Sequence, residues 1–318
     1  MNEQKPDVSV VVLTYNVQWE KLRPTLESIL AQQDVAFEII MADDGSAVRL
    51  DAQTLALCHA HGFDRLLFSN CEKNGGTCKN LWHGIQQASG RYIKPFSPGD
   101  LLYDRGTLRD WVTFMDETDC EASFGDAVYY RKDSVRGEIV SARSAPVQRQ
   151  LFTGKPGRKL FVDYLLANDT VLGAAVMMRA ERMRTDLARF VDRVIYAEDY
   201  MLRLAVFEAR DIRYFARRVI WYEYGSGIST AANEKWQRLL QRDFDACNAI
   251  IAESPHRGAL GKKYVRYLAN SQKPGIRRKL CKCAAFPDMI AWRLRNRRGS
   301  RTPTDASLTE LNRMLSGL

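Results

Sequence analysis

The chain contains 318 residues, of which 46% are hydrophobic and 27% are charged, a composition typical of a globular protein with a sizeable core. No apolar run approaches the ~20 residues of a membrane-spanning helix, and the first ten residues lack the layout of a signal peptide, so we expect a cytoplasmic protein. The formal net charge of +9 lies in residues 273–301, which hold ten basic residues and one acidic residue, while the rest of the chain is neutral. We therefore expect no nucleic-acid partner. The seven cysteines lack the paired spacing of a metal site, which predicts reduced thiols.

Two apolar runs near the N-terminus predict buried strands. Val8–Leu13 and Phe37–Met41 lack polar alternation, which is typical of a parallel sheet covered by helices on both faces. Each run ends in polar residues at the point where an open parallel sheet binds its ligand. These polar residues are Thr14, Tyr15 and Asn16 after the first run, and Asp43 and Asp44 after the second. The two runs together predict an α/β enzyme that handles a nucleotide.

The following segments continue the alternation of helix and strand. The pattern predicts helices at 51–61 and 75–88 and strands at 64–70 and 91–96, the rhythm of a doubly wound sheet. Residues 121–131 predict a further strand. Residues 132–159 are rich in Arg, Ser, Pro and Gly, which indicates either a connector or a lid.

The second half predicts the remainder of the sheet and then helices. After a helix from residue 161, an apolar strand pair is expected around 168–179, followed by a second helix that starts near the acidic pair Glu198-Asp199. A strand at 212–224 runs into a glycine-containing turn or flexible loop. Beyond residue 233 the chain is helical and increasingly basic. We therefore predict an α/β domain at 1–232 and a helical basic extension at 233–318.

Four segments in this order carry a resemblance to a known family. They are VVLTYN, ADDGS, NGGTCKNLWHGIQQASGRYIKPFSPGD and AEDYMLRLA. Together they resemble glycosyltransferase family 2, inverting enzymes of the GT-A fold, over roughly residues 7–230. The resemblance implies a Rossmann-like, mostly parallel sheet flanked by helices, and an enzyme of the bacterial surface-polysaccharide type.

The resemblance assigns the nucleotide to the first two strand ends. In the family, the Thr-Tyr-Asn turn and the strand-end acidic pair hold the nucleotide, which maps to Thr14, Tyr15, Asn16, Asp44 and the adjacent Asp43. Asn74 belongs to a turn that leads into a helix, and Lys79 stands where a basic residue often approaches the diphosphate. The alternatives are an ordinary Asp-Gly turn at Asp44 and a capped surface helix that leaves Lys79 in solvent.

A second part of the resemblance concerns a divalent metal. Ser97-Pro98-Gly99-Asp100 aligns with the family's acidic metal motif, which implies that Asp100 holds Mn²⁺ or Mg²⁺ against the phosphates of the donor, with Gly99 beside them. The chain departs from the motif at Ser97 and Gly99, where the family carries carboxylates. The alternative is an ordinary Pro-Gly-Asp turn.

The third part of the resemblance is the catalytic base. Glu198-Asp199 resembles the family's Glu-Asp pair, in which a carboxylate deprotonates the acceptor hydroxyl as it attacks the anomeric carbon. We assign the base to Asp199 and a supporting role to Glu198, and the reverse assignment stays open. The alternative is an acidic helix start favoured by the helix dipole. The loop 221–230 has Tyr224, Ser226 and Ser229 where relatives often carry a histidine-containing lid.

The basic segment 273–301 interleaves its cations with apolar residues. This pattern predicts interfacial helices that attach to the inner face of the cytoplasmic membrane, near a lipid-linked acceptor. The alternative is a solvated helical pair that packs on the catalytic domain.

The leading hypothesis is transfer of a sugar from a nucleotide-sugar donor, expected to be UDP-linked, to a hydroxyl of a saccharide or a polyprenyl-linked oligosaccharide. A nucleotidyltransferase or a dinucleotide-dependent oxidoreductase would need a glycine-rich phosphate loop after the first strand, and the sequence LTYNVQWEK has none. The alternative hypothesis is a non-catalytic module that binds a nucleotide-sugar, a membrane or nucleic acid. This hypothesis does not explain why Asp44, Asp100 and Asp199 occur as an ordered set.

Overall fold

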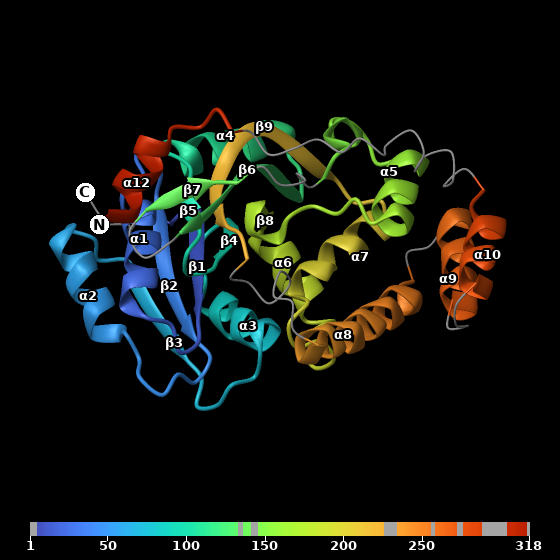
Figure 1. Ribbon diagram of the computed structural model, residues 1–318, viewed down its shortest axis with the longest axis horizontal. Coiled ribbons are helices and arrows are strands. Elements are labelled where there is room, and N and C mark those ends of the chain that lie inside the picture. The colour runs from blue at the N-terminus through green and yellow to red at the C-terminus, as the bar shows by residue number, and fades with distance from the viewer. Residues whose placement is uncertain are drawn as a thin grey trace.

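A central β-sheet with helices on both faces organises the protein (Figure 1). The computed structural model describes residues 5–132, 136–140, 146–225, 234–255, 258–271, 276–287 and 304–316. These residues form a nine-stranded sheet in the order β3-β2-β1-β4-β8-β6-β9-β5, with β7 paired to β6. The predicted α/β architecture is confirmed.

The N-terminal part of the sheet is parallel. Its strands are β1 (Val8–Thr14), β2 (Phe37–Asp43), β3 (Leu66–Asn70) and β4 (Tyr92–Phe96), joined by α1 (Trp19–Leu30), α2 (Asp51–Ala60) and α3 (Thr77–Gln87). Every strand and helix predicted between residues 8 and 96 is present. The register pairs Thr14 with Asp43, so the polar ends of β1 and β2 lie side by side at one edge of the sheet.

The second part of the sheet mixes strand directions. Its strands are β5 (Leu101–Leu102), β6 (Ala122–Lys132), β7 (Gly137–Ile139), β8 (Val176–Arg179) and β9 (Ile212–Glu223). β8 runs antiparallel to both β4 and β6, whereas β6 and β9 are parallel. The helices here are α4 (Thr107–Thr118), α5 (Arg158–Val162), α6 (Ala180–Leu187) and α7 (Met201–Phe207).

The prediction of two strands around 168–179 is wrong, because only β8 forms there. A π-helical turn at Asp163–Ala167 precedes Asn168, which adopts a left-handed backbone with φ of 59°. A 3-10 turn at Gly173–Ala175 then leads into β8. The apolar residues in this stretch belong to an irregular segment whose side chains pack in the core. The periodicity of the sequence cannot distinguish such a segment from a short buried strand.

The core lies on both faces of the sheet, and β1 shows why its sequence is continuously apolar. Val10 and Val12 pack on one face with α1 and α4, while Val11 and Leu13 pack on the other with α3, α6 and α7. Successive side chains of a strand point to opposite faces, so a strand covered on both sides must be apolar at nearly every position.

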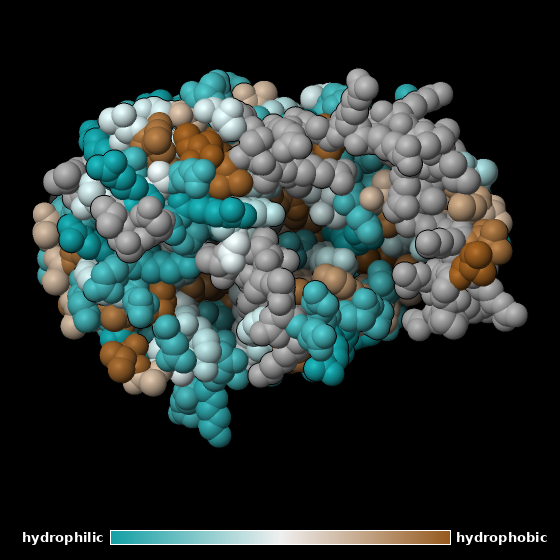
Figure 2. All heavy atoms as spheres, viewed as in Figure 1, coloured by the Kyte–Doolittle hydropathy of each residue, from teal (hydrophilic) through white to brown (hydrophobic). Residues whose placement is uncertain are grey.

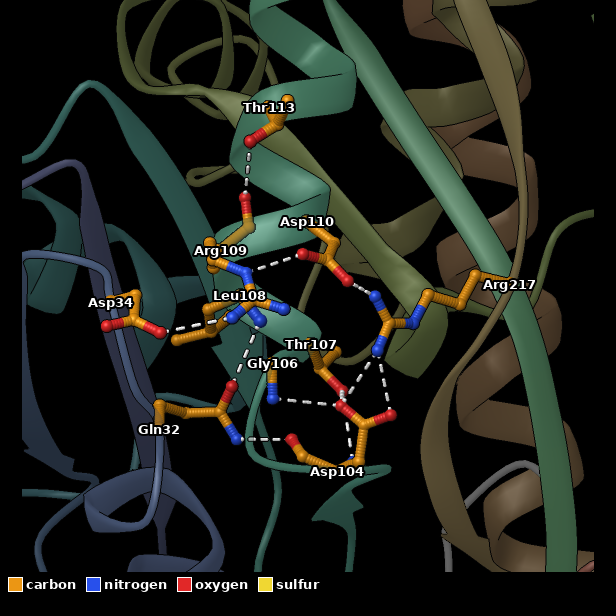
Figure 3. A network of polar contacts seen from close by, with 10 residues as sticks. All are labelled: Gln32, Asp34, Asp104, Gly106, Thr107, Leu108, Arg109, Asp110, Thr113 and Arg217. Carbon is orange, nitrogen blue, oxygen red and sulfur yellow. Dashed lines mark hydrogen bonds and ion pairs between the residues drawn. The ribbon is translucent and has the colours of Figure 1, made fainter.

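Polar contacts fix the turn between β5 and α4 (Figure 3). Arg217 of β9 forms ion pairs with Asp104 at 2.8 Å and with Asp110. Gln32 donates to the carbonyl oxygen of Asp104 at 2.7 Å and accepts the backbone N–H of Leu108 at 3.0 Å. Because β5 follows Asp100 directly, this network also holds in place the turn that carries the predicted metal ligand.

The helical extension packs on the α/β domain at two separate places. Its helices are α8 (Glu234–Glu253), α9 (Ala259–Ser271), α10 (Ile276–Ala285) and α12 (Leu308–Ser316). Cys247, Ile251 and Tyr264 join the core on the α7 side. In Figure 1, α12 lies beside α1, far from α9 and α10, and its Leu311 is fully buried near β5 and β9. The described part of the extension thus consists mainly of helices.

None of the helices in the described ranges is both long and apolar enough to span a bilayer. The cysteines described there, Cys58, Cys71, Cys78, Cys120, Cys247 and Cys283, are free thiols.

Candidate active site

The turns after β1 and β2 are tied together by the residues that were predicted to hold the nucleotide. Thr14 donates its hydroxyl to Asp43 Oδ2 at 2.9 Å, and Asp43 Oδ1 accepts the backbone N–H of Ser46 at 2.8 Å. Asn16 has a left-handed φ of 47°, and its Oδ1 accepts the N–H of Ala47 at 3.0 Å. Thr14 and Asp43 are buried, and their hydrogen bonds set the shape of this edge.

Asp44 joins the same edge to the turn before α3. Its two carboxylate oxygens accept the N–H groups of Gly75 at 2.8 Å and Gly76 at 2.9 Å. Burial raises the pKa of Asp44, although these two amides oppose the shift. Asn74 is exposed, with its backbone against Gly45, where an added Cβ would lie 3.0 Å from the Asn74 nitrogen. Asp44 is buried, so in this structure its carboxylate joins the end of β2 to the turn before α3.

Tyr15 and Lys79 are two of the predicted donor residues whose side chains reach solvent. Tyr15 is 52% exposed, and Lys79 is exposed with its aliphatic stem against Gly75. Both therefore lie at the edge formed by the strand ends and the start of α3. The structure brings together Thr14, Tyr15, Asn16, Asp43, Asp44, Asn74 and Lys79 at this edge, and their roles toward a nucleotide stay predictions.

A segment distant in sequence closes one side of this edge. Ile195 packs so tightly on Gly76 that an added Cβ would lie 2.2 Å from Ile195 Cγ2, and its carbonyl accepts the N–H of Cys78 at 2.9 Å. Burial raises the pKa of the next residue, Tyr196, with Asp44 among the nearby charges. The Tyr196 ring meets Trp236 of α8 edge-on at 5.0 Å. No pattern in the sequence predicted a role for Tyr196, because only the fold brings it near Asp44.

The acidic pair follows three residues later in the same segment. Glu198 and Asp199 form a 3-10 turn (Glu198–Tyr200) that leads into α7, where an acidic helix start was predicted. Asp199 is exposed and lies against Gly173, where an added Cβ would be 3.0 Å from Asp199 Oδ2. Figure 2 shows that this face of the molecule is hollowed between the part built on β1–β4 and the part built on α7 and α8.

Burial acts on both carboxylates in the same direction. Burial and the adjacent Asp199 raise the pKa of Glu198 to about 8, and Glu198 Oε2 is buried without a hydrogen-bond partner among the described residues. Surrounding protein also raises the pKa of Asp199, which Arg203 in α7 partly offsets. Asp199 is the exposed carboxylate of the pair, and the raised pKa of Glu198 favours the neutral form of that side chain at neutral pH.

Asp100 lies in a tight turn at the same end of the sheet. Thr25 of α1 accepts the N–H of Gly99 at 2.9 Å and donates to the carbonyl oxygen of Asp100 at 2.9 Å. Asp100 Oδ1 accepts the N–H of Glu223 at the end of β9 at 3.1 Å. Gly99 has φ of +100°, and Tyr130 donates its hydroxyl to the Gly99 carbonyl. Asp100 is only 5% exposed, which restricts its access to a ligand.

This turn does not fit a divalent ion in the way the family motif would hold one. Burial raises the pKa of Asp100, and the fully buried Lys94 on β4 is among its nearest charges. Lys94 donates to the carbonyl oxygens of Pro95 and Ala174 at 2.7 Å, and burial lowers its pKa. Glu223 is paired with Lys21 at 2.6 Å. The described part of the chain contains no group of three or more His, Cys, Asp or Glu suited to a metal ion.

The loop after β9 falls only partly within the described residues. Tyr224 stacks on Tyr129 at 5.8 Å between ring centroids, and Arg131 lies 5.2 Å from the Tyr224 ring centroid. Tyr224 is thus packed on β6. Ser226 and Ser229, which were expected in the same lid, lie outside the described residues, as do residues 273–275 and 288–301 of the predicted membrane segment 273–301.

A mostly parallel α/β sheet, with polar residues gathered at its strand ends and the exposed carboxylate of Asp199 close to them in the fold, is the architecture of the GT-A class of transferases. Residues 9–181 match the model of the family described as Glycosyl transferase family 2. The chain belongs to this family.

Comparison with known proteins supports the same class. An uncharacterized glycosyltransferase of Rickettsia conorii is 27% identical over 180 residues, which is 56% of this chain and 27% of the relative. One of Rickettsia bellii is 32% identical over 173 residues, which is 54% of this chain and 23% of the relative. The aligned part therefore spans about a quarter of these relatives.

Solved structures with the same fold include S. aureus TarS. It superimposes with a TM-score of 0.57 at 16% identity over 90% of this chain and 49% of TarS. A shorter form, TarS 1–349 in complex with UDP-GlcNAc, gives a TM-score of 0.56 at 17% identity over 89% of this chain and 80% of that one. The confirmed fold is therefore that of a glycosyltransferase.

Proposed function

We propose that the protein is an inverting glycosyltransferase that transfers a sugar from a UDP-linked donor to a hydroxyl of a saccharide or polyprenyl-linked oligosaccharide in bacterial surface-polysaccharide biosynthesis. The observation that carries this proposal is the segment 195–199. Its Ile195 packs on Gly76 at the start of α3, its Tyr196 lies near enough to Asp44 to feel its charge, and it presents the exposed carboxylate of Asp199.

The chemistry assigns one task to each group. Asp199 accepts the proton of the acceptor hydroxyl while the hydroxyl oxygen bonds to the anomeric carbon. The bond from that carbon to the donor phosphate oxygen breaks, and its electron pair leaves with the nucleoside diphosphate. Glu198, whose pKa burial raises to about 8, stays largely protonated at neutral pH and so adds no second negative charge beside Asp199. In this proposal the base acts on the acceptor side, as inversion requires.

The donor class is proposed from the neighbours and from the site. TarS is described in complex with UDP and with UDP-GlcNAc. In this chain Tyr15 and Lys79 offer an exposed ring and an exposed cation at the strand ends, which suit a base and a phosphate. A competing proposal is that Mn²⁺ or Mg²⁺ bound at Asp100 balances the charge of the diphosphate. We derive no step of the reaction from this ion.

Calorimetric titration with UDP, GDP, CDP and dTDP tests the donor proposal. We expect UDP to bind most tightly and the others to bind more weakly. Absence of binding to all four would contradict the proposed function and favour a non-catalytic module instead.

We also propose that the basic extension attaches the enzyme to the inner face of the cytoplasmic membrane. Ile276 and Leu280, one turn apart on α10, are 74% and 62% exposed, within a strongly basic segment. Apolar side chains flanked by cations bind anionic headgroups. In co-sedimentation with anionic liposomes, we expect Ile276→Ser/Leu280→Ser to bind more weakly than Leu55→Ser, which alters an exposed leucine on α2. Equal binding by both variants would contradict this surface.

A further inference from the structure

Lys21 lies directly over the turn that the resemblance assigns to the donor diphosphate. This residue is on α1, and its ammonium group is 2.6 Å from the Glu223 carboxylate at the end of β9. A Cβ added to Gly99 would lie 2.2 Å from Glu223 Oε2 and 2.8 Å from Lys21 Cε. The cation, the carboxylate and the Gly99 backbone are therefore packed against each other above Asp100.

We propose that Lys21 binds the diphosphate of the donor at the Gly99-Asp100 turn and makes donor binding independent of a divalent metal. This inference rests on the proposed function, because it assumes that a nucleoside diphosphate occupies this end of the sheet. The residue lies outside all four segments that carry the family resemblance. Only the packing of α1 against β5 and the ion pair with Glu223 bring it to the turn.

The carboxylates at this turn are already engaged by protein groups. Asp100 Oδ1 accepts the N–H of Glu223, and Asp100 is 5% exposed, so it has little room to coordinate an ion. The Glu223 carboxylate is held by Lys21. A divalent ion at this place would have to displace the lysine or sit against its positive charge, and both are unfavourable.

Lys21 is suited to a phosphate by chemistry and by access. Its side chain is 37% exposed, so the ammonium group can reach a ligand above the turn. A lysine ammonium is a compact point charge with three donors and is a common phosphate binder. A partly exposed ion pair contributes little to stability, so an incoming diphosphate can compete with Glu223 for the cation. Negative charge on the diphosphate grows as the glycosidic bond breaks, and Lys21 would stabilise it.

The test measures binding of UDP, GDP, CDP and dTDP by calorimetry, in excess EDTA and in Mn²⁺. For the diphosphate that binds most tightly, we expect the affinity of the wild type in EDTA to equal its affinity in Mn²⁺ within about twofold. We expect Lys21→Gln to weaken it at least about tenfold, or about 1.4 kcal/mol, in both. Lys21→Arg keeps the charge and should retain most of the affinity. Arg23→Gln is the matched control, because Arg23 lies on the same helix and pairs with Glu27 at 2.8 Å.

Glu223→Gln separates this proposal from a metal site. If Lys21 is the phosphate-binding cation, removing its anionic partner leaves binding unchanged or tightens it. If Glu223 is instead a metal ligand, the variant weakens binding only in Mn²⁺, and the proposal is wrong. Loss of wild-type binding in EDTA, or an unchanged affinity of folded Lys21→Gln, would also overturn it. Failure of all four diphosphates to bind wild type would instead remove the proposed function and this inference with it.

Discussion

Asp243 of α8 accepts the backbone N–H of Tyr196 at 2.6 Å, and its same oxygen, Oδ2, accepts the N–H of Ile195 at 3.0 Å. Asp243 is fully buried. A residue of the helical extension therefore holds the segment that leads to the acidic pair Glu198-Asp199. This contact makes the extension part of the active-site scaffold.

Asp243→Ala should destabilise the protein and lower its activity. Hydrogen bonds to a charged group contribute about 1.5–3 kcal/mol, and two buried N–H groups lose their acceptor. We expect the free energy of unfolding to fall by about 2–4 kcal/mol in urea denaturation. Asp245→Ala changes an exposed carboxylate on the same helix that accepts a hydrogen bond from Gln241 at 3.1 Å, and it should have little effect. Equal loss in both variants would contradict the role of Asp243.

Asp199→Asn should lower transfer by about 10²–10⁴-fold while leaving binding of the donor diphosphate nearly unchanged, because a general base acts in the chemical step. The measurement is the rate of sugar transfer from the donor identified by calorimetry to a panel of polyprenyl-linked saccharides. Asp192→Asn, seven residues upstream and exposed, is the control. Retained transfer by Asp199→Asn would assign the base to another group, with Glu198 the first to test.

The stability of the protein should fall between about pH 5 and pH 8 because of Glu198. The pKa of Glu198 is raised from 4.5 to about 8, so the folded state holds its proton through a range in which the unfolded chain has lost it. Stability is therefore greatest below the unfolded pKa and is lost as pH rises toward the folded value. Glu198→Gln removes this titration. Between pH 5 and pH 8, we expect the free energy of unfolding of the variant to rise by at least about 1 kcal/mol relative to that of wild type. Parallel pH profiles of the two proteins would disprove the assignment.

Gly99→Ala should be more destabilising than a change at another glycine with positive φ. At Gly99 an added Cβ meets Glu223 Oε2 at 2.2 Å, whereas at Gly62, with φ of +64°, it meets nothing within 4 Å. The left-handed backbone alone costs a residue with a side chain about 1–2 kcal/mol, and this cost lowers the stability of both variants. We expect Gly99→Ala to lose at least about 1 kcal/mol more in urea denaturation, through displacement of Glu223 or Lys21. Equal losses would show that the turn is not tightly packed.

The sequence by itself determined the elements and the order of the motifs. Apolar runs such as Val8–Leu13 predicted buried strands correctly, because a strand covered on both faces has no position for a polar side chain. Local signals also located the acidic pair at a helix start. The same reasoning was wrong at 168–179, because the apolar residues there pack from an irregular segment and a short apolar run has no period of its own.

Only the tertiary structure decided which residues meet. Lys21 reaches Glu223, Asp243 reaches Tyr196, and α12 returns to α1 across the whole chain. Lys94 is a single polar residue in an apolar strand, and its burial against two carbonyl groups depends on β8 and the turn before it. Periodicity and turn chemistry act over a few residues, so they record local structure. Contacts between residues far apart in the sequence depend on how the helices pack on the sheet, and that packing is decided by the whole core.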